Sequence, residues 1–409
     1  MAVAAKKLAA LASLPDAVVF LLVQAGLVCQ WAYDYEHYAR GNLTVADMYS
    51  LVAVQQLCML LGPWLSALVQ PLRLAKPLVI VALVSAEVSC LAKIWGFYWT
   101  ASVVQGLFLS ALVACLNPAA QPAALDLWQN YACQIAWTAA AVAVDLFRFS
   151  LAMVYGMAAC AYLQAAILVA RKLSPPQHLA PSRRAESGWS LEARLKSLAA
   201  HIEDMALMAR AVSDVCIDAV AILTRAAFPG LVLESCASLL DSPGMLFVVR
   251  LCVERAGSRH GLWASQSGCW GVTSWGLPSR MLGYALAVVG MAIYFGTASS
   301  ALDVCTSHFL VAYAVALAAA SEPPVPPWHT TAGGLLSAGL LLWGCGGDAS
   351  FDAALGWSSV LLCVGLLSTL AGALAQVGGY LRWRVRTLRN CFTSWATIRF
   401  SRLWAPVHD

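Results

Sequence analysis

The sequence predicts an all-α fold: a polytopic transmembrane helix bundle of about 12 spans, arranged as six plus six around a cytoplasmic linker. Of its 409 residues, 61% are hydrophobic and 11% are charged, whereas soluble domains carry about 25% charged residues. The mean hydropathy is +0.72, and apolar residues form blocks of roughly 17–25, the length that crosses a bilayer as a helix. Blocks such as Leu78–Leu83 and Leu335–Trp343 lack the alternation of membrane β-strands.

Six predicted spans precede the linker. Lys6 and Lys7 come before the first apolar run, which ends at the aromatic residues Trp31 and Tyr33. Aromatic residues at the end of a run suit a membrane interface, so we expect an uncleaved span here rather than a signal peptide. The six spans are predicted at residues 17–33, 48–69, 78–97, 101–121, 131–147 and 150–170.

A change in composition marks the linker, residues 171–204, which hold six Lys/Arg, four acids and three prolines. Its end has an amphipathic pattern: Ser190 is the expected N-cap, and Leu191, Leu195 and Leu198 fall on one helical stripe. We expect this helix to lie on the membrane surface, with binding of a partner as the alternative.

The second half carries more charge inside its apolar runs. Pro229-Gly230 are expected to break the first of these runs, as happens where carriers unwind a helix at a binding site. The second run is short and passes into a basic segment, 254–260, and then into a Gly/Ser/Trp-rich stretch. The spans are predicted at residues 206–233, 243–253, 281–297, 302–320, 331–345 and 355–380.

Basic segments set the predicted topology, because Lys and Arg resist translocation. The N-terminus and the tail are both basic, so both termini are expected in the cytoplasm. The cytoplasmic loops are predicted at 71–76, 171–204 and 254–260, and the outer turns at 34–47, 241–243, 298–303 and 347–353. The pattern predicts a multi-pass integral membrane protein but does not indicate which membrane. We divide the chain into an N-terminal half (1–170), the linker (171–204), a C-terminal half (205–380) and a basic cytoplasmic tail (381–409).

A sequon lies in the first predicted outer loop, at Asn42-Leu43-Thr44. A three-residue match is a weak signal by itself. Its position outside the membrane makes Asn42 the candidate glycosylation site.

The sequence lacks the motifs that are typical of soluble enzymes and of zinc- or phosphate-binding proteins. The fourteen cysteines form no CxxC pair and no zinc-binding spacing, and we interpret them as small apolar helix residues. No phosphate-binding loop, nucleophile elbow or HExxH motif occurs. We therefore expect no enzyme activity, no cofactor, no metal and no nucleic acid partner.

Ionisable residues inside a span are the candidates for function, because each is costly in lipid. Glu87 and Lys93 lie in the third predicted span, six residues apart and on different faces, so each needs a partner elsewhere or a wet cavity. Lys93 could also extend its amine to the outer boundary. A structural ion pair is the alternative role for Glu87.

The seventh predicted span is the most informative. Asp214 and Asp218 are four residues apart, and Arg225 follows seven residues later on the same helical face. Three charges on one face are expected to point into the bundle or a cavity, with an interfacial helix as the alternative. His308, in the tenth span, is either a proton carrier or a hydrogen-bonded core histidine.

Several motifs in the first half resemble carriers of the major facilitator family. Leu60-Leu61-Gly62-Pro63, followed by a basic turn, looks like the second span of that family, and Val104-Gln105-Gly106 and Asn117-Pro118-Ala119-Ala120 look like its fourth. The layout also resembles equilibrative nucleoside transporters. The sequence departs from the facilitator pattern at Gln70 and Pro71, which stand near the usual Asp and Arg, and its second half lacks a matching signature.

A rival resemblance is to herpesvirus multispanning envelope proteins, which have a nucleoside-transporter-like fold. It rests on a Tyr- and Asp-rich outer loop near 33–49 and on a last apolar run, 370–380, that passes directly into a basic tail. The first resemblance implies a carrier that moves small polar solutes, with a proton or cation as a further ligand, by alternating access. The alternative is a non-transporting membrane protein that acts through partners and membrane organisation.

Overall fold

The computed structural model describes the greater part of both predicted halves. The described residues are 14–61, 75–115, 137–139, 141–144, 149–171, 205–236, 243–266, 277–297, 300–319, 328–343, 352–375 and 387. Within these ranges all regular structure is helical and no strand occurs, so the all-α prediction is confirmed. The predicted linker, its amphipathic helix and almost all of the basic tail lie outside the described residues, so their boundaries remain predictions.

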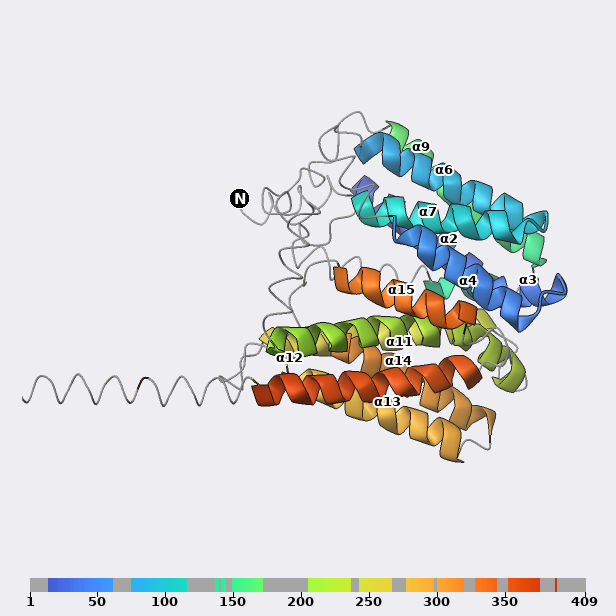
Figure 1. The fold of residues 1–409 in the computed structure, drawn as a ribbon. Helices are drawn as coiled ribbons and strands as arrows, with labels where there is room; N and C mark the ends of the chain where they lie inside the picture. The colour runs from blue at the N-terminus through green and yellow to red at the C-terminus, as the bar shows by residue number, and fades with distance from the viewer. Residues whose placement is uncertain are drawn as a thin grey trace, which may run out of the picture.

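Helices from the first part of the chain pack into one bundle, drawn in blue to green in Figure 1. They are α2 (Leu14–Trp31), α3 (Asp34–Arg40), α4 (Val45–Met59), α6 (Ala75–Ile94), α7 (Tyr98–Cys115) and α9 (Leu151–Arg171). Helix α6 packs against α7 and α9, α2 packs against α9, and α4 packs against α7. Phe108, Tyr155 and Tyr162 are buried in the core of this bundle.

Two glycines shape the N-terminal bundle. Gly106 lets α7 approach α4 closely, since a Cβ atom there would lie 2.5 Å from the backbone oxygen of Gln55. Gly96 ends α6 in a left-handed conformation with φ +80°. The Phe97 N–H then donates to Ala92 C=O and the Gly96 N–H to Lys93 C=O, at 2.8 and 3.0 Å, which is a Schellman motif. This turn fixes the outer end of α6.

Helices from the second part of the chain form the other bundle, drawn in yellow-green to red in Figure 1. They are α11 (Met205–Cys236), α12 (Pro243–Gln266), α13 (Leu277–Thr297), α14 (Ala301–Ala319), α15 (Trp328–Trp343) and a last helix, Asp352–Ala375. Helix α14 packs against α11, α12 and α13. The buried core of this bundle includes Val220, Leu223 and Leu341.

The two bundles meet where α15 packs against α4, where α12 packs against α2 and where α11 packs against α3. Helix α15 lies between α11 of its own bundle and α4 of the other (Figure 1), and Tyr49 and Ala53 of α4 join the C-terminal core. Helix α12 packs against α2, where Val248 contacts a cluster formed with Val28 and Trp137. Helices α4, α15, α2 and α12 therefore border the boundary between the bundles.

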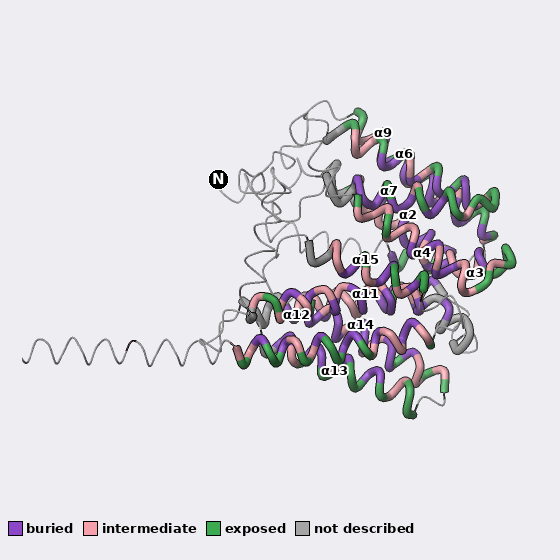
Figure 2. The backbone as a smooth tube through the Cα atoms, viewed as in Figure 1, coloured by how far each residue is buried: buried purple, intermediate pink, exposed green. Residues whose placement is uncertain are grey.

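The helices carry exposed apolar residues on their outward faces. Exposed and buried residues alternate along the helices in Figure 2. Val81, Val84 and Val88 of α6 are exposed on one face, and Trp95, Phe97 and Trp99 are exposed at its outer turn. Such large apolar faces suit a lipid environment, with aromatic residues at the interface. Five helices in the described part are long and apolar enough to cross a membrane: 77–94, 151–171, 279–297, 301–319 and 352–375.

Two predictions made from the sequence for the second half are wrong. Helix α11 continues through Pro229-Gly230 to Cys236 instead of breaking, because proline removes only one backbone hydrogen bond and packed neighbours such as Phe228 hold the helix at that level. Helix α12 runs over 24 residues to Gln266, so residues 254–260 are helical rather than a loop after a short span. Their charges are accommodated by partners on other helices, described below.

One cysteine departs from the expectation that all are simple apolar helix residues. Cys305 takes part in a disulfide, whereas seven others in the described residues, among them Cys29, Cys90 and Cys216, are free. Cys305 lies in the second turn of α14, close to the predicted outer turn 298–303.

Candidate functional site

The most densely charged buried region lies between α11, α12 and α14. Arg250 and Glu254 of α12 are four residues apart, and Nε of Arg250 donates to Glu254 Oε1 at 3.0 Å. Arg225 of α11 reaches the same carboxylate, with Nη2 donating to Oε2 at 2.8 Å and Nε to Oε1 at 3.3 Å. One carboxylate therefore serves two guanidinium groups.

Arg250 is held by several further contacts and is only 2% exposed. Its Nη1 donates to the backbone carbonyl of Thr224 at 2.9 Å and to His308 Nε2 at 2.6 Å. Its guanidinium also stacks over Phe228, 4.7 Å from the ring centre, and Phe228 stacks on His308. Because arginine only donates, His308 must accept through Nε2. In this arrangement His308 is a hydrogen-bonded core residue.

Arg225 differs from Arg250 in the exposure of its side chain. Its side chain is 58% exposed, whereas that of Glu254 is 13% exposed. Glu254 is its only hydrogen-bond or ion-pair partner among the described residues. A charged group with one partner and an open side is free to exchange that partner.

The second charged group lies toward the start of α11. Asp214 forms an ion pair with Arg280 of α13, and its Oδ2 atom is buried without a hydrogen-bond partner. Beside it, Ser213 Oγ lies 2.9 Å from Tyr284 Oη and 2.8 Å from Thr369 Oγ1. This polar contact joins α11 to α13 and to the last helix within the C-terminal core.

Asp218 lies between these two groups on α11 and is half-buried. No hydrogen bond or ion pair joins it to another described residue, while Asp214, Arg280 and Arg225 act on it electrostatically. A Cβ atom on Gly333 of α15 would lie 2.7 Å from the Asp218 Cβ, so Asp218 faces the helix that borders the other bundle. A carboxylate so placed can take up a proton or a cation.

The N-terminal bundle holds a third group around Lys93, which is fully buried. Its Nζ donates to Asp34 Oδ1 and Oδ2 at 2.7 and 2.8 Å and to Gln30 Oε1 at 3.3 Å. Tyr155 Oη also donates to Asp34 Oδ1, at 2.7 Å. His37 Nε2 donates to the Lys93 carbonyl at 2.8 Å. Lys93 therefore has a partner at the start of α3 and does not extend to the boundary.

The structure separates most of the residues that the sequence singled out. Asp214, Asp218 and Arg225 share α11, but Asp214 binds α13, Arg225 binds α12 and Asp218 faces α15. Glu87 is half-buried on α6, with no hydrogen-bond or ion-pair partner among the described residues. Asn42 is exposed between α3 and α4, in a left-handed conformation with φ 59°.

Four charged residues of these groups were not predicted as candidates from the sequence: Asp34, Arg250, Glu254 and Arg280. Asp34 was assigned to an outer loop, Arg250 and Glu254 to a poorly defined region, and Arg280 stood at the edge of a span. Each is a charged residue next to or inside an apolar run. This criterion, applied to the ends of the predicted spans as well as to their interiors, would have identified all four residues as candidates.

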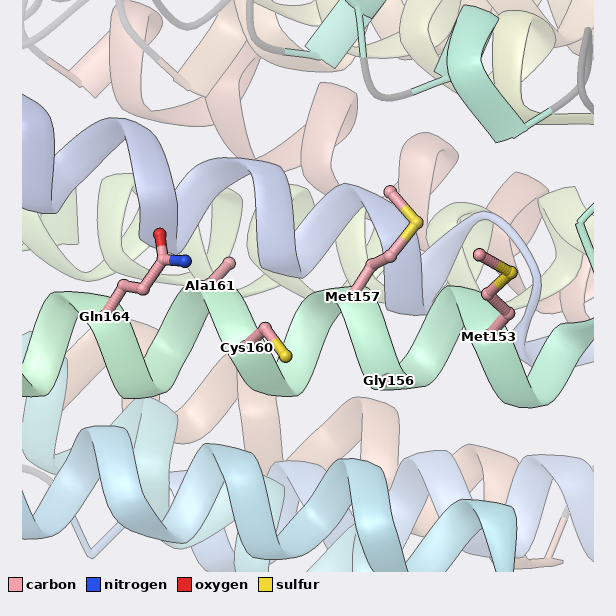
Figure 3. A pocket seen from close by; sticks show the side chains of 6 residues that line it. All are labelled: Met153, Gly156, Met157, Cys160, Ala161 and Gln164. Atoms are coloured by element: carbon pink, nitrogen blue, oxygen red, sulfur yellow. The ribbon is translucent and has the colours of Figure 1, made fainter.

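Two surface hollows are lined by residues of the N-terminal bundle and by none of the charged residues described above. One runs along α9, where Met153, Met157 and Cys160 line it (Figure 3), and another is lined by Val81, Val84 and Val104 of α6 and α7. Both lie on outward apolar faces, and neither is between the bundles. No group of three or more metal-ligating side chains that could hold an ion occurs in the described ranges.

The arrangement of the helices is that of solved membrane transporters. A mutant of nucleoside transporter NupG matches with a TM-score of 0.62 at 10% identity, over 89% of this chain and 99% of that chain. A D-xylose-proton symporter matches with a TM-score of 0.59 at 12% identity, over 88% and 97%. A peptide transporter, POT, in complex with sulfate, matches with a TM-score of 0.60 at 10% identity, over 88% and 94%.

No protein-family model and no curated protein matches the sequence. At such low identity the structural likeness shows the fold alone, which is the fold of these solved transporters. The resemblance to herpesvirus envelope proteins gains no support from these comparisons.

Proposed function

We propose that the chain is a secondary-transporter-like carrier of small polar solutes that works by alternating access between its two helix bundles. The observation that carries the proposal is the fold that the chain shares, across nearly its whole length, with a nucleoside transporter, a D-xylose-proton symporter and a peptide transporter. Charged residues beside the boundary between the bundles support it, because buried charge in a membrane protein is retained at a cost.

Asp218 is the proposed cation- or proton-binding residue of this carrier. Among the α11 carboxylates whose side chains are described, it alone has no hydrogen bond or ion pair with another described residue. It faces α15, which contacts both bundles. Asp214, Arg225, Glu87, Lys93 and His308 are the further candidates for solute or ion binding, of which Arg225 is the most accessible.

Uptake by the purified full chain in proteoliposomes tests the proposal. A panel of nucleosides, sugars, amino acids, vitamins and peptides is offered with and without an imposed proton gradient. Asp218→Asn keeps the side-chain volume and removes the charge, so it should abolish uptake while leaving thermal stability near that of the parent. If the parent moves nothing in the panel and Asp218→Asn only lowers stability, the carrier proposal is wrong.

A non-transporting membrane protein is the second candidate, and one observation favours it. Charges that could line a path are paired with one another: Lys93 with Asp34, Asp214 with Arg280 and Arg225 with Glu254. A scaffold would use these pairs only for stability. Under that reading their removal would change unfolding but no solute would bind or move.

The orientation in the membrane is part of the proposal. We place both termini and residues 171–204 in the cytosol, because these segments hold most of the Lys and Arg. Labelling of a cysteine introduced at position 187 with a membrane-impermeant reagent checks it. Labelling only from the outer side would contradict the assignment.

Glycosylation of Asn42 would mark the outer side independently. Asn42 has a positive φ and Thr44 of the sequon caps α4, so Asn42→Gly removes the acceptor at a position that suits glycine. Loss of a glycosidase-sensitive gel shift in Asn42→Gly supports an outer loop. A shift that persists in this variant would show that the glycan is elsewhere.

A further inference from the structure

We infer that Arg225 is the docking group for an anionic substituent, a carboxylate or a phosphate, of the solute, and that Glu254 is the internal counter-ion which that substituent displaces. This inference rests on the carrier proposal and names its substrate class. It is carried by the two-to-one arrangement of guanidinium and carboxylate groups between α11 and α12.

The first step is the charge of the group. Arg225 and Arg250 bring two positive charges and Glu254 brings one negative charge. His308 accepts a hydrogen bond from Arg250 and adds no charge as an acceptor. The group therefore keeps one positive charge that its own residues do not balance. A net cation in a water-poor region attracts an anion strongly.

The second step is that the two arginines are held differently. Arg250 is fixed by Glu254, the Thr224 carbonyl, His308 and the ring of Phe228, and it is almost completely buried. Arg225 has Glu254 as its only hydrogen-bond or ion-pair partner among the described residues, and its side chain is mostly exposed. If Arg225 turns to an incoming anion, Glu254 keeps its bond to Arg250. No buried charge is then left without a partner, which is what makes such an exchange inexpensive.

The third step is access. Arg225 lies on α11, which borders α15, and Glu254 lies on α12, which packs against α2 of the other bundle. The group is thus beside the boundary between the bundles, where a solute passes in the proposed carrier. The nearest other acid on this side of α11 is Asp218, whose field also acts on Arg225. That carboxylate would repel the anionic end of a solute toward Arg225.

The chemistry of arginine selects the substituent. A guanidinium offers parallel N–H donors that match the two oxygens of a carboxylate or phosphate. Arg225 already presents Nε and Nη2 in this way to the Glu254 carboxylate. A solute carboxylate would reproduce the same geometry, while a neutral hydroxyl or amide would not replace the charge.

Matched solute pairs test the inference on the full chain in lipid nanodiscs. The pairs are glucuronate and glucose, glutamate and glutamine, and uridine monophosphate and uridine, with inorganic phosphate as the bare anion. Binding is measured by calorimetric titration. At least one anionic member is expected to bind about tenfold or more tightly than its neutral partner, the effect of one charge-assisted contact.

Variants assign that preference to Arg225. Arg225→Gln should remove the preference, and Arg225→Lys should retain part of it, since the charge remains and the planar fork is lost. Glu254→Gln should strengthen anion binding, because it removes the competing internal carboxylate. Arg40→Gln is the matched control: Arg40 also pairs with a glutamate, Glu36, but on the exposed surface of α3, so the preference should persist.

The inference is overturned if no anionic member binds more tightly than its neutral partner, or if Arg225→Gln keeps the preference in a chain that unfolds at the parental temperature. The proposed function fails in a different way. An anion that binds through Arg225 but is never taken up would contradict the carrier and leave the anion site standing. Uptake of a solute by a chain that binds no anionic member more tightly than its neutral partner would leave the carrier and remove the site.

Discussion

The two bundles use buried charge in different ways. In the N-terminal bundle the ammonium of Lys93 faces one carboxylate, Asp34, and Gln30 and Tyr155 bond to that pair. In the C-terminal bundle two guanidiniums share Glu254, and one of them, Arg225, is exposed. A balanced, closed pair suits a fixed contact, whereas an unbalanced and open group suits binding. The comparison separates structural charge from the charge that is a candidate for function.

The largest expected effect is on the closed pair. Asp34→Asn leaves the buried ammonium of Lys93 without a counter-charge, so the free energy of unfolding should fall by about 3–5 kcal/mol. The double variant Asp34→Asn/Lys93→Met should recover much of this loss, because no charge is then stranded. Chemical denaturation in detergent measures both. A single variant as stable as the parent would show that the pair is not the fixed contact described here.

The two arginines of the C-terminal group should differ in the same assay. Arg250→Gln removes bonds to Glu254, the Thr224 carbonyl and His308 and should cost about 2–3 kcal/mol. Arg225→Gln should cost less than about 1 kcal/mol, because Arg225 is exposed and Glu254 keeps Arg250. Equal losses for the two variants would contradict the distinction between a fixed and an exchangeable arginine.

Tyr155 sharpens the comparison within the N-terminal bundle. Tyr155→Phe removes the hydroxyl that donates to Asp34 Oδ1 and keeps the ring in place, so the expected loss is about 1.5 kcal/mol. Lys93 still satisfies both oxygens of Asp34, which limits the effect. Loss of stability as large as that of Asp34→Asn would mean that the hydroxyl, rather than the ammonium, holds the group together.

The smallest effect is expected at the outer turn that leads from α3 to α4. Thr44 and Asp47 form a capping box, in which each side chain accepts from the other residue's backbone N–H, so Thr44→Ala should cost about 1 kcal/mol and Thr44→Ser little. Bonds from Thr44 lower the pKa of Asp47 below its usual range. The stability from Asp47 is therefore present above the unfolded-state pKa, near 4, and is lost as the pH falls through the folded-state value.

A titration of stability against pH checks this last point. The difference between the parent and Asp47→Asn should be present at neutral pH and shrink well below pH 4. The difference should be small throughout, since Asp47 is at the surface. A difference that grows on acidification would have the wrong sign for a carboxylate whose pKa is lowered by folding.

Helices α11 and α12 show how much of the structure could be predicted from the sequence. Periodicity placed Asp214, Asp218 and Arg225 on one face of one helix, and α11 does carry all three. The same reasoning failed at Pro229, where local propensity predicted a break and tertiary packing kept the helix. It also failed at α12, whose charged run from Glu254 to Arg259 resembles a loop. In the folded chain Glu254 pairs with Arg225 of α11, and Arg255 lies over the Trp137 ring.

By itself the sequence determined that this is a helical membrane protein, because the length and apolarity of each block are properties of a single segment. It also identified some of the charges that a span has to accommodate, such as Lys93 and Asp214, but missed Asp34 and Glu254. Only the tertiary structure decided their partners: Lys93 meets Asp34, Asp214 meets Arg280, and Arg250 meets His308, pairs that lie 59, 66 and 58 residues apart. Helical periodicity fixes the face of one helix, whereas the neighbour that meets this face depends on side-chain packing across several helices.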